Sequence, residues 1–461
     1  MGAVIIFIID RKIRATHAFF TILFLLICLS AAPAFGNEAI APSDSPKTTH
    51  YIKHGVPRIR TGLSTEDEWS TLAGPIQPGG EPLLKYKPSE GYDIKALGLT
   101  IKPSYTLILQ GTPDPNLPPG SGKFGASWNL YLDFAKKIED YGLIFCQIMS
   151  GWGETVAPDL KLFSNVNCSY YDIGGRIKAR RYYYEQYLYD KSVTLRVGMF
   201  KAADWFDQNN CEDDSDKEFL NDAFNSSPAV DWPSSWGTTF AEYIEAFVPG
   251  TDFLELSAAH FEGNADYQQM FEHGLYIAQA TIRTDKLFGF DPKNWMGHYR
   301  AYGWVNNRTH SKYAAQGEIT GPGDYINYGF GVSIDQKIDP YIFIFGRLGW
   351  QRPDVIPASG GANVEWTWST GLQVNGCYWK RPNDHFAFAV GQDFVSKNYI
   401  NAGNAGANEG HIEVYYAWKM NPCLTLSPDL QLIWNPHGVS QSCQGDAEPV
   451  FVYGGRLNLV F

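Results

Sequence analysis

The feature that most restricts the fold of this chain is a series of blocks, each about ten residues long, in which apolar and polar residues alternate. A period of two places successive side chains on opposite faces, which is the pattern of a β-strand and not of a helix. The aromatic content of 15%, with 45 Gly and 27 Pro, also favours strands and turns. Sixteen such blocks follow one another: 97–110, 127–136, 142–151, 182–190, 192–201, 239–248, 252–263, 275–286, 297–307, 326–336, 341–350, 364–374, 384–394, 411–420, 423–434 and 450–461.

The links between these blocks alternate in length. Links such as "KIEDY", the single Lys191 and "NP" are tight, whereas 152–181 and 202–238 are long. Short turns on one side and long loops on the other are typical of outer-membrane barrels. A closed barrel also satisfies every backbone hydrogen bond in lipid. The sequence therefore predicts an all-β fold over residues 97–461, a 16-stranded antiparallel transmembrane β-barrel with short periplasmic turns and long external loops. A soluble β-sandwich or propeller is the alternative.

The two faces of the blocks differ in the way that a barrel between lipid and water requires. In block 192–201, Val193, Leu195 and Val197 share one face, and Thr194 and Arg196 share the other. Block 423–434 likewise sets leucines against polar residues. Apolar residues outside and polar residues inside are the pattern of a water-filled membrane barrel.

The N-terminus reads as an export signal. Arg11, Lys12 and Arg14 precede an apolar stretch at 18–32, and small residues precede Asn37. We predict that residues 1–36 are a signal peptide and that the mature chain resides in the outer membrane of a bacterial cell. An N-terminal membrane anchor is the alternative. Residues 37–96 do not follow the strand pattern and are predicted to form a periplasmic extension or partial plug.

Charge and motif content argue against several classes of function. The net charge of -12 argues against nucleic acid as a partner. The chain has no CxxC or His-rich spacing, so we expect no metal, and nothing indicates another cofactor. No GxSxG is present, and the chain is not predicted to be an enzyme. Catalysis by residues of the lumen and a secreted glycan-binding β protein stay open as alternatives.

Three stretches carry a resemblance to a known family. "YYYEQYLYDKSVTLRVGMFKAADWFDQNN" and "FLNDAFNSSPA" within 182–233, "SPDLQLIWNPHG" at 427–438, and the final "GRLNLVF" resemble the carbohydrate-selective porin family (OprB-type). The resemblance implies passive, selective diffusion of monosaccharides and related neutral sugars through a loop-constricted pore. The alternative is a general porin or a porin for another solute. Phe461 resembles the C-terminal signal of outer-membrane barrels, which implies the assembly machinery as a partner besides sugar and outer-membrane lipid.

Candidate pore residues cluster around the link 202–238. A sugar offers hydroxyl groups at its edge and C–H groups on its faces, so charged, amide and aromatic side chains suit its passage. Glu185 and Arg196 have an alternative role as an ion pair that joins two strands, and Trp205 has one as a core aromatic residue of the loop. The predicted constriction consists of Glu185, Arg196, Lys201, Asp204, Trp205, Asp207, Asn209 and Asn210.

Two further expectations concern covalent and subunit contacts. Cys168 and Cys211 lie in the two longest links, and we hypothesise a disulfide between them that joins these links. Whether the barrel is a monomer or a homo-oligomer stays open.

Overall fold

The computed structural model describes residues 70–71, 84–87, 91–94, 97–113, 124–160, 162–212, 214–233, 238–263, 272–314, 317–358, 364–439 and 449–460. The predicted signal peptide, most of the predicted N-terminal extension, and Phe461 lie outside the described residues.

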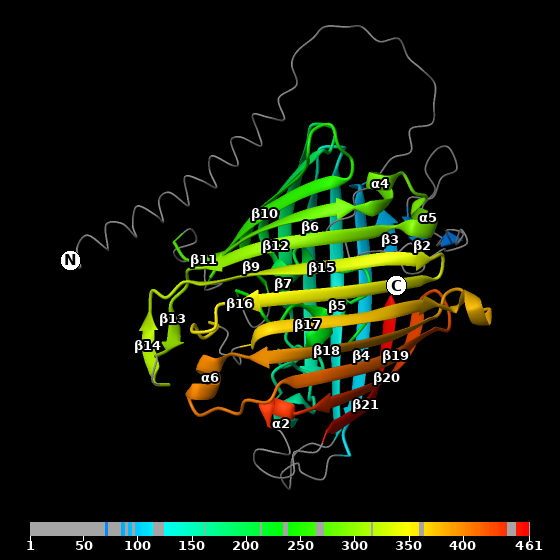
Figure 1. Ribbon diagram of the computed structural model, residues 1–461. Coiled ribbons are helices and arrows are strands. Elements are labelled where there is room, and N and C mark those ends of the chain that lie inside the picture. Colours follow the sequence, from blue (N-terminus) through cyan, green and yellow to red (C-terminus); the bar gives the residue numbers. More distant parts are fainter. Residues whose placement is uncertain are drawn as a thin grey trace.

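The chain forms one antiparallel sheet that closes on itself (Figure 1). The last strand pairs with the first strand of the ring, with Leu457 opposite Leu107 and Val460 opposite Ser104. The strands of the ring are β4 (Leu99–Gly111), β5 (Phe124–Ile138), β6 (Gly142–Gly153), β7 (Lys178–Leu188), β8 (Val193–Lys201), β9 (Thr238–Phe247), β10 (Leu254–Glu262), β11 (Gly274–Arg283), β12 (Gly297–Asn306), β15 (Asn327–Asp339), β16 (Ile342–Gln351), β17 (Val364–Asn375), β18 (His385–Val395), β19 (Glu409–Lys419), β20 (Leu424–Trp434) and β21 (Val450–Val460).

These strands confirm the predicted barrel. The sheet has 19 strands, of which β1–β3 lie outside the closed ring, so 19 − 3 leaves sixteen. Each predicted block overlaps one of the sixteen, in order. The period of two is sufficient to identify them because each strand has lipid on one side and the lumen on the other.

The two ends of the barrel differ, as the link lengths indicate. One end carries a hairpin of β13 (His310–Tyr313) and β14 (Ile319–Gly323), together with α6 (Lys397–Asn401) (Figure 1). The other end has mostly tight turns, but α4 (Thr284–Phe288) and α5 (Pro292–Trp295) fill the link between β11 and β12, and a short 3-10 helix lies in the link between β17 and β18. The remaining short helices are α2 (Ala157–Leu160), α3 (Asp222–Asn225), η2 (Ala202–Asp204), η3 (Gly376–Trp379) and η4 (Pro436–Gly438). None of the helices in the described residues is long and apolar enough to cross a membrane.

Three strands of the N-terminal segment extend the sheet beside the seam. They are β1 (Ser70–Thr71), β2 (Leu84–Lys87) and β3 (Gly91–Ile94). β3 pairs with the start of β4, where Tyr92 faces Ile101. β21 pairs with the same edge of β4 from Ser104 onward, so β3 and β21 follow one another along this edge. Pro103 lies between the two pairings, at a point where β4 needs no N–H donor on that edge. The backbone of this segment therefore covers an edge that would otherwise stay open.

Burial separates the outer face of the wall from the lumen. In β20 the outward Leu430 is 48% exposed, whereas the neighbouring Asp429 is 2% exposed. Many inward side chains are polar and buried. They are covered because two long links, the β6–β7 loop (154–177) and the β8–β9 loop (202–237), enter the lumen, as their hydrogen bonds to distant strands show.

Candidate functional site: the loops inside the barrel

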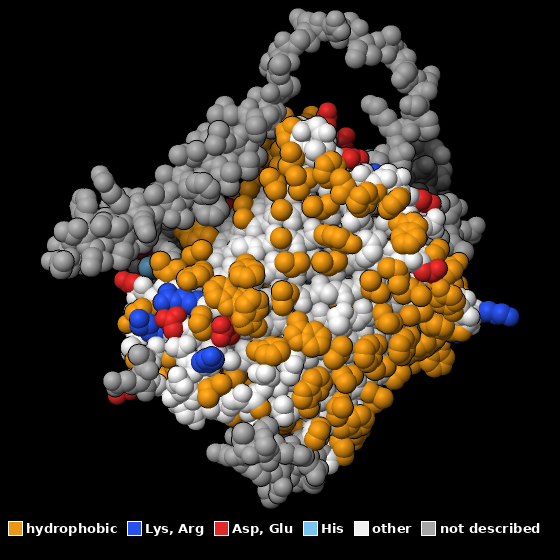
Figure 2. Space-filling model, in the orientation of Figure 1, with side chains coloured by type: hydrophobic (Ala, Val, Ile, Leu, Met, Phe, Trp, Pro, Cys, Tyr) orange, Lys and Arg blue, Asp and Glu red, His pale blue; other side chains and the backbone are white. Residues whose placement is uncertain are grey.

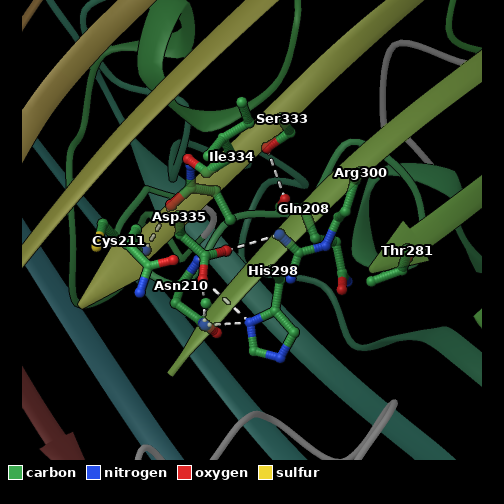
Figure 3. A network of polar contacts seen from close by, with 12 residues as sticks. Gln208, Asn210, Cys211, Thr281, His298, Arg300, Ser333, Ile334 and Asp335 are labelled. Atoms are coloured by element: carbon green, nitrogen blue, oxygen red, sulfur yellow. Dashed lines mark hydrogen bonds and ion pairs between the residues drawn. The ribbon is translucent and has the colours of Figure 1, made fainter. Parts of the chain in front are cut away.

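The β8–β9 loop crosses the lumen and is attached to the far wall at several places. Its first attachment is to β12 and β15. Asp335 on β15 accepts hydrogen bonds from the backbone N–H and the side-chain amide of Asn210, at 3.2 and 2.7 Å. The same carboxylate contacts Arg300 Nη1 at 2.6 Å and His298 Nδ1 at 3.1 Å. Figure 3 shows Asp335 between these groups, so one fully buried carboxylate joins two strands to the loop.

The second attachment is Arg347 on β16. Its Nε lies 3.0 Å from Asp207 Oδ1 and its Nη1 lies 3.1 Å from Glu212 Oε1. The guanidinium also donates to the backbone carbonyls of Asp207 and Phe224, at 2.9 and 3.1 Å. A guanidinium carries five N–H donors in a fixed plane, which suits it to hold several acceptors at once. Arg347 therefore connects both halves of the loop to one point on the wall.

The third attachment holds the tip of the loop, which we define as the backbone turn 214–218. In this turn the N–H groups of Lys217 and Glu218 donate to the carbonyl of Asp214. Arg456 on β21 donates from Nη1 to the carbonyls of Ser215 and Glu218, at 2.8 and 2.6 Å. Just after the tip, Glu413 on β19 accepts the N–H groups of residues 220 and 221, at 2.6 and 2.8 Å. The tip and the residues just after it are therefore attached to β21 and β19, near the C-terminal end of the chain.

The β6–β7 loop also folds inward and contacts the β8–β9 loop. Cys168 N–H donates to the carbonyl of Leu220 at 2.8 Å, and Asp222 N–H donates to the carbonyl of Asn165 at 2.7 Å. The hydroxyl of Ser169 donates to Asp216 at 2.6 Å. The two long links therefore form one body inside the barrel.

This contact corrects the disulfide hypothesis. Cys168 and Cys211 are not joined to each other in the described structure. The Cys168 backbone lies beside Leu220, whereas Cys211 packs in a separate apolar cluster with Phe219 and Phe224. Burial raises the pKa of the Cys168 thiol. The two loops are joined by backbone hydrogen bonds and by the Ser169–Asp216 contact, and not by a bond between these two cysteines.

One group of metal-ligating residue types among the described residues, Asp393, Glu409 and His411, lies on β18 and β19 and is fully buried. The amide nitrogen of Asn221 faces His411 Nδ1 at 3.1 Å, while the amide oxygen of Asn221 accepts the N–H of Ala223. Nδ1 of His411 therefore faces a donor, and Nε2 lies 3.0 Å from Glu409 Oε1, so both ring nitrogens already have partners inside the protein.

The same group attaches both loops to the wall. Glu409 Oε1 accepts the N–H groups of Phe163 and Ser164, at 2.9 and 3.1 Å, and Asp393 accepts the Ser164 hydroxyl at 2.8 Å. We therefore assign this group to loop attachment.

Three of the predicted constriction residues form a buried unit against the wall. Arg196 Nε donates to Glu185 at 2.9 Å, and the guanidinium carbon of Arg196 lies 3.3 Å from the centre of the Trp205 ring. The exposed fractions of Arg196, Glu185 and Trp205 are 2%, 3% and 4%. Their packing agrees with the alternative roles of strand-joining pair and loop-core aromatic. Their side chains are almost fully covered by other parts of the protein.

The other five predicted residues divide into two groups. Asp207, Asn209 and Asn210 attach the loop to the wall, with Asn209 donating to the carbonyl of Ile334 at 3.2 Å. Lys201 and Asp204 keep partial exposure inside the barrel. The carboxylate of Asp204 lies 3.1 Å from the Arg181 guanidinium, and the two side chains are 26% and 18% exposed.

The most exposed charges of the loop tip were absent from the predicted set. Asp214 and Lys217 form an ion pair at 2.5 Å, with side chains 31% and 39% exposed. Asp133 on β5 interacts electrostatically with Arg181, Lys102 and Lys217. We call Lys102, Asp133, Arg181, Lys201, Asp204, Asp214 and Lys217 the lumen charge set.

The lumen charge set mixes both signs at short range. Donors and acceptors therefore line the passage without a strong field of a single sign. The alternating pattern of blocks 97–110 and 127–136 would have found Lys102 and Asp133. Arg181 precedes the predicted block 182–190, so the pattern gave no signal for it.

Comparison with known proteins agrees with this geometry. Residues 156–461 match the model of "Carbohydrate-selective porin, OprB family". A search of curated proteins gave no match.

Among solved structures, the chain is similar to the high-pH structure of Pseudomonas putida OprB, with a TM-score of 0.64 and 17% identity, covering 79% of this chain and 95% of that one. It also matches the channel DcaP of Acinetobacter baumannii, with a TM-score of 0.46 and 13% identity, over 80% of this chain and 99% of that one. The first likeness supports the porin fold, and the second adds no argument.

Proposed function

From the premise that the chain belongs to the carbohydrate-selective porin, OprB family, we propose that it lets neutral sugars of monosaccharide size diffuse passively across the outer membrane. The observation that carries the proposal is the mixed lumen charge set beside the inward-folded loops. Sugars need hydrogen-bond donors and acceptors along their path, whereas a field of one sign would favour ions. Lys217 and Asp214 supply both signs at the loop tip.

The test is a swelling assay on liposomes that contain the purified protein. Glucose is expected to enter faster than a disaccharide and faster than an ionic solute of glucose size, because the loops narrow the lumen and neither sign dominates there. Liposomes without protein are the control. Entry that depends on solute size alone would reduce the protein to an unselective porin, and equal exclusion of all three solutes would contradict the proposal.

For the N-terminal segment we propose a wall extension in the periplasm, because β3 continues the pairing of β4. The signal peptide at 1–36 and recognition of Phe461 by the assembly machinery stay predictions, since both lie outside the described residues.

For the subunit partner we propose a second copy of the chain, docked on the outer face of β9–β12. This face carries a polar pair on the lipid side, with His260 Nδ1 3.1 Å from Glu242 Oε2. Charged side chains such as Glu242 cost free energy on the lipid face of a barrel, and a partner that covers them would lower this cost. A patch with both a donor and an acceptor can pair with its own copy about a twofold axis.

The shape of this face also suits close approach of another barrel. Ala258 faces Ala278, which faces Gly303, and Ala280 faces Ala301 in the next row. Figure 2 shows only small, separated apolar areas over β10 and β12, while large ones cover β19–β21. Small side chains leave room for a neighbour to pack.

Replacing Ala278 with Trp is expected to convert an oligomer to a monomer in mild detergent, because the indole would separate the two faces. Light scattering coupled to size exclusion measures the mass. The matched control is Leu348→Trp, a lipid-facing position on β16 that is 41% exposed and outside the patch. A wild-type protein that is already monomeric, or an oligomer that tolerates Ala278→Trp, would show that lipid and not a second copy covers the patch.

A further inference from the structure

Arg456 occupies an unusual position among the charged side chains of the lumen. It lies on the closing strand β21, where it faces Ser427 on β20 and Ile108 on β4. It is 3% exposed, and its guanidinium lies 5.6 Å from the centre of the Tyr415 ring. Its guanidinium interacts electrostatically with Asp429 on β20, but its hydrogen bonds go to the loop.

Both hydrogen bonds end on backbone carbonyls of the tip. Nη1 donates to Ser215 and to Glu218, which lie on either side of Lys217. The carbonyl groups at the end of a single backbone turn lack partners within the turn, and a basic side chain can satisfy them. Removing the donor would leave the buried carbonyl of Glu218 and the partly buried carbonyl of Ser215 without this donor. Leaving a buried acceptor unpaired costs more free energy than the net strength of its hydrogen bond. Arg456 therefore fixes the position of the turn relative to β21.

Side chains of the tip hold the turn only locally: Glu218 accepts the N–H of Asp214 at 3.2 Å, and Asp214 accepts the N–H of Asp216 at 3.1 Å. Asp214 and Lys217 are paired with each other and are partly exposed to the lumen. Asp216 accepts the hydroxyl of Ser169 from the β6–β7 loop. Arg456 therefore acts on the passage through the backbone, without presenting its own charge to the solute.

We propose that Arg456 is the positioning residue of the loop tip: it fixes the place of Lys217 and Asp214 in the pore, and it couples the narrowing of the channel to the closure of the barrel by β21. The inference rests on the proposed function, because it concerns the same passage. It predicts a separate result, however, because the selectivity of the channel between cations and anions can be measured in KCl without any sugar.

The experiment is a double-mutant cycle on cation-to-anion selectivity, measured as the reversal potential of single channels in a KCl gradient. Lys217→Ala alone is expected to shift selectivity toward cations, because one positive charge leaves the passage. In an Arg456→Met background the same change is expected to lose about half of its effect or more, because Lys217 no longer stands in the narrow part. The folded barrel, followed by its heat-sensitive migration on a gel, is expected to persist.

Asn458→Ala is the matched control. Asn458 shares the strand and the inward face of Arg456, and it donates to Thr106 on β4 at 2.9 Å. Its cycle with Lys217→Ala is expected to be additive. If Arg456→Met yields no folded barrel, Arg456→Lys replaces it, since lysine keeps the charge but loses the planar fork.

An additive cycle with either Arg456 variant, or coupling equal to that of Asn458→Ala, would overturn the inference. If sugars fail to enter the liposomes but the Arg456–Lys217 cycle is still non-additive, the proposed function is contradicted. The role of Arg456 in positioning the loop tip would then still hold.

Discussion

Replacing Arg196 with methionine is expected to destabilise the barrel by about 3–5 kcal/mol, because Glu185 would be left as a buried carboxylate without its partner. Arg196 and Glu185 are each nearly fully buried, and the Trp205 ring covers the guanidinium. The measurement is the urea concentration at which the protein unfolds in lipid vesicles, followed by tryptophan fluorescence.

The second half of this experiment replaces both charges. In Arg196→Met with Glu185→Leu, most of the loss is expected to be recovered, since apolar residues of similar volume often substitute for a buried pair at little cost. Unchanged stability of Arg196→Met together with altered sugar selectivity would instead support the original interpretation, in which Arg196 contacts the solute.

Replacing Arg347 with methionine is expected to have the largest effect on the open channel. This guanidinium contacts the side chains of Asp207 and Glu212 and the carbonyls of Asp207 and Phe224. Its loss would leave two buried carboxylates without their cation, so we expect the β8–β9 loop to leave the far wall. Single-channel conductance in KCl is expected to rise by about twofold or more, because the loop no longer narrows the passage.

The matched control is Arg352→Met, which lies just beyond the end of the same strand. Arg352 pairs with Asp354 at 2.5 Å outside the lumen. Its replacement is expected to leave conductance unchanged. A conductance of Arg347→Met equal to that of the wild type would show that Asp335 and Arg456 suffice to hold the loop.

The barrel could be predicted from the sequence because each strand and each short turn is specified by residues that are close together in the chain. Each strand repeats a two-residue period imposed by lipid and water, and turns of few residues need recognisable chemistry. The hairpin of β13 and β14 was missed, since it lies within a long link and bears no such alternation. The two short helices α4 and α5 between β11 and β12 were also not predicted, because they depend on packing against β12 and β15.

The candidate site could be predicted only in outline. The two long links were expected to narrow the lumen, and both enter it. The partners of the polar side chains could not be predicted, because they are far apart in the chain. Asp207 pairs with Arg347, and Asn210 donates a hydrogen bond to Asp335. Arg196 and Trp205 have the residue types of a sugar site, but burial decides their role, and burial depends on how the loop packs.

The order in which the supports of the loop are made has a consequence for the cell. The loop leaves β8 early in the chain, but Asp335, Arg347, Glu413 and Arg456 follow in the second half, and Ser215 stands 241 residues before Arg456. A chain in which β19–β21 have not yet joined the sheet therefore lacks the supports that Glu413 and Arg456 give to the loop. Insertion of the C-terminal strands thus completes the wall and the attachment of the loop tip in the same step.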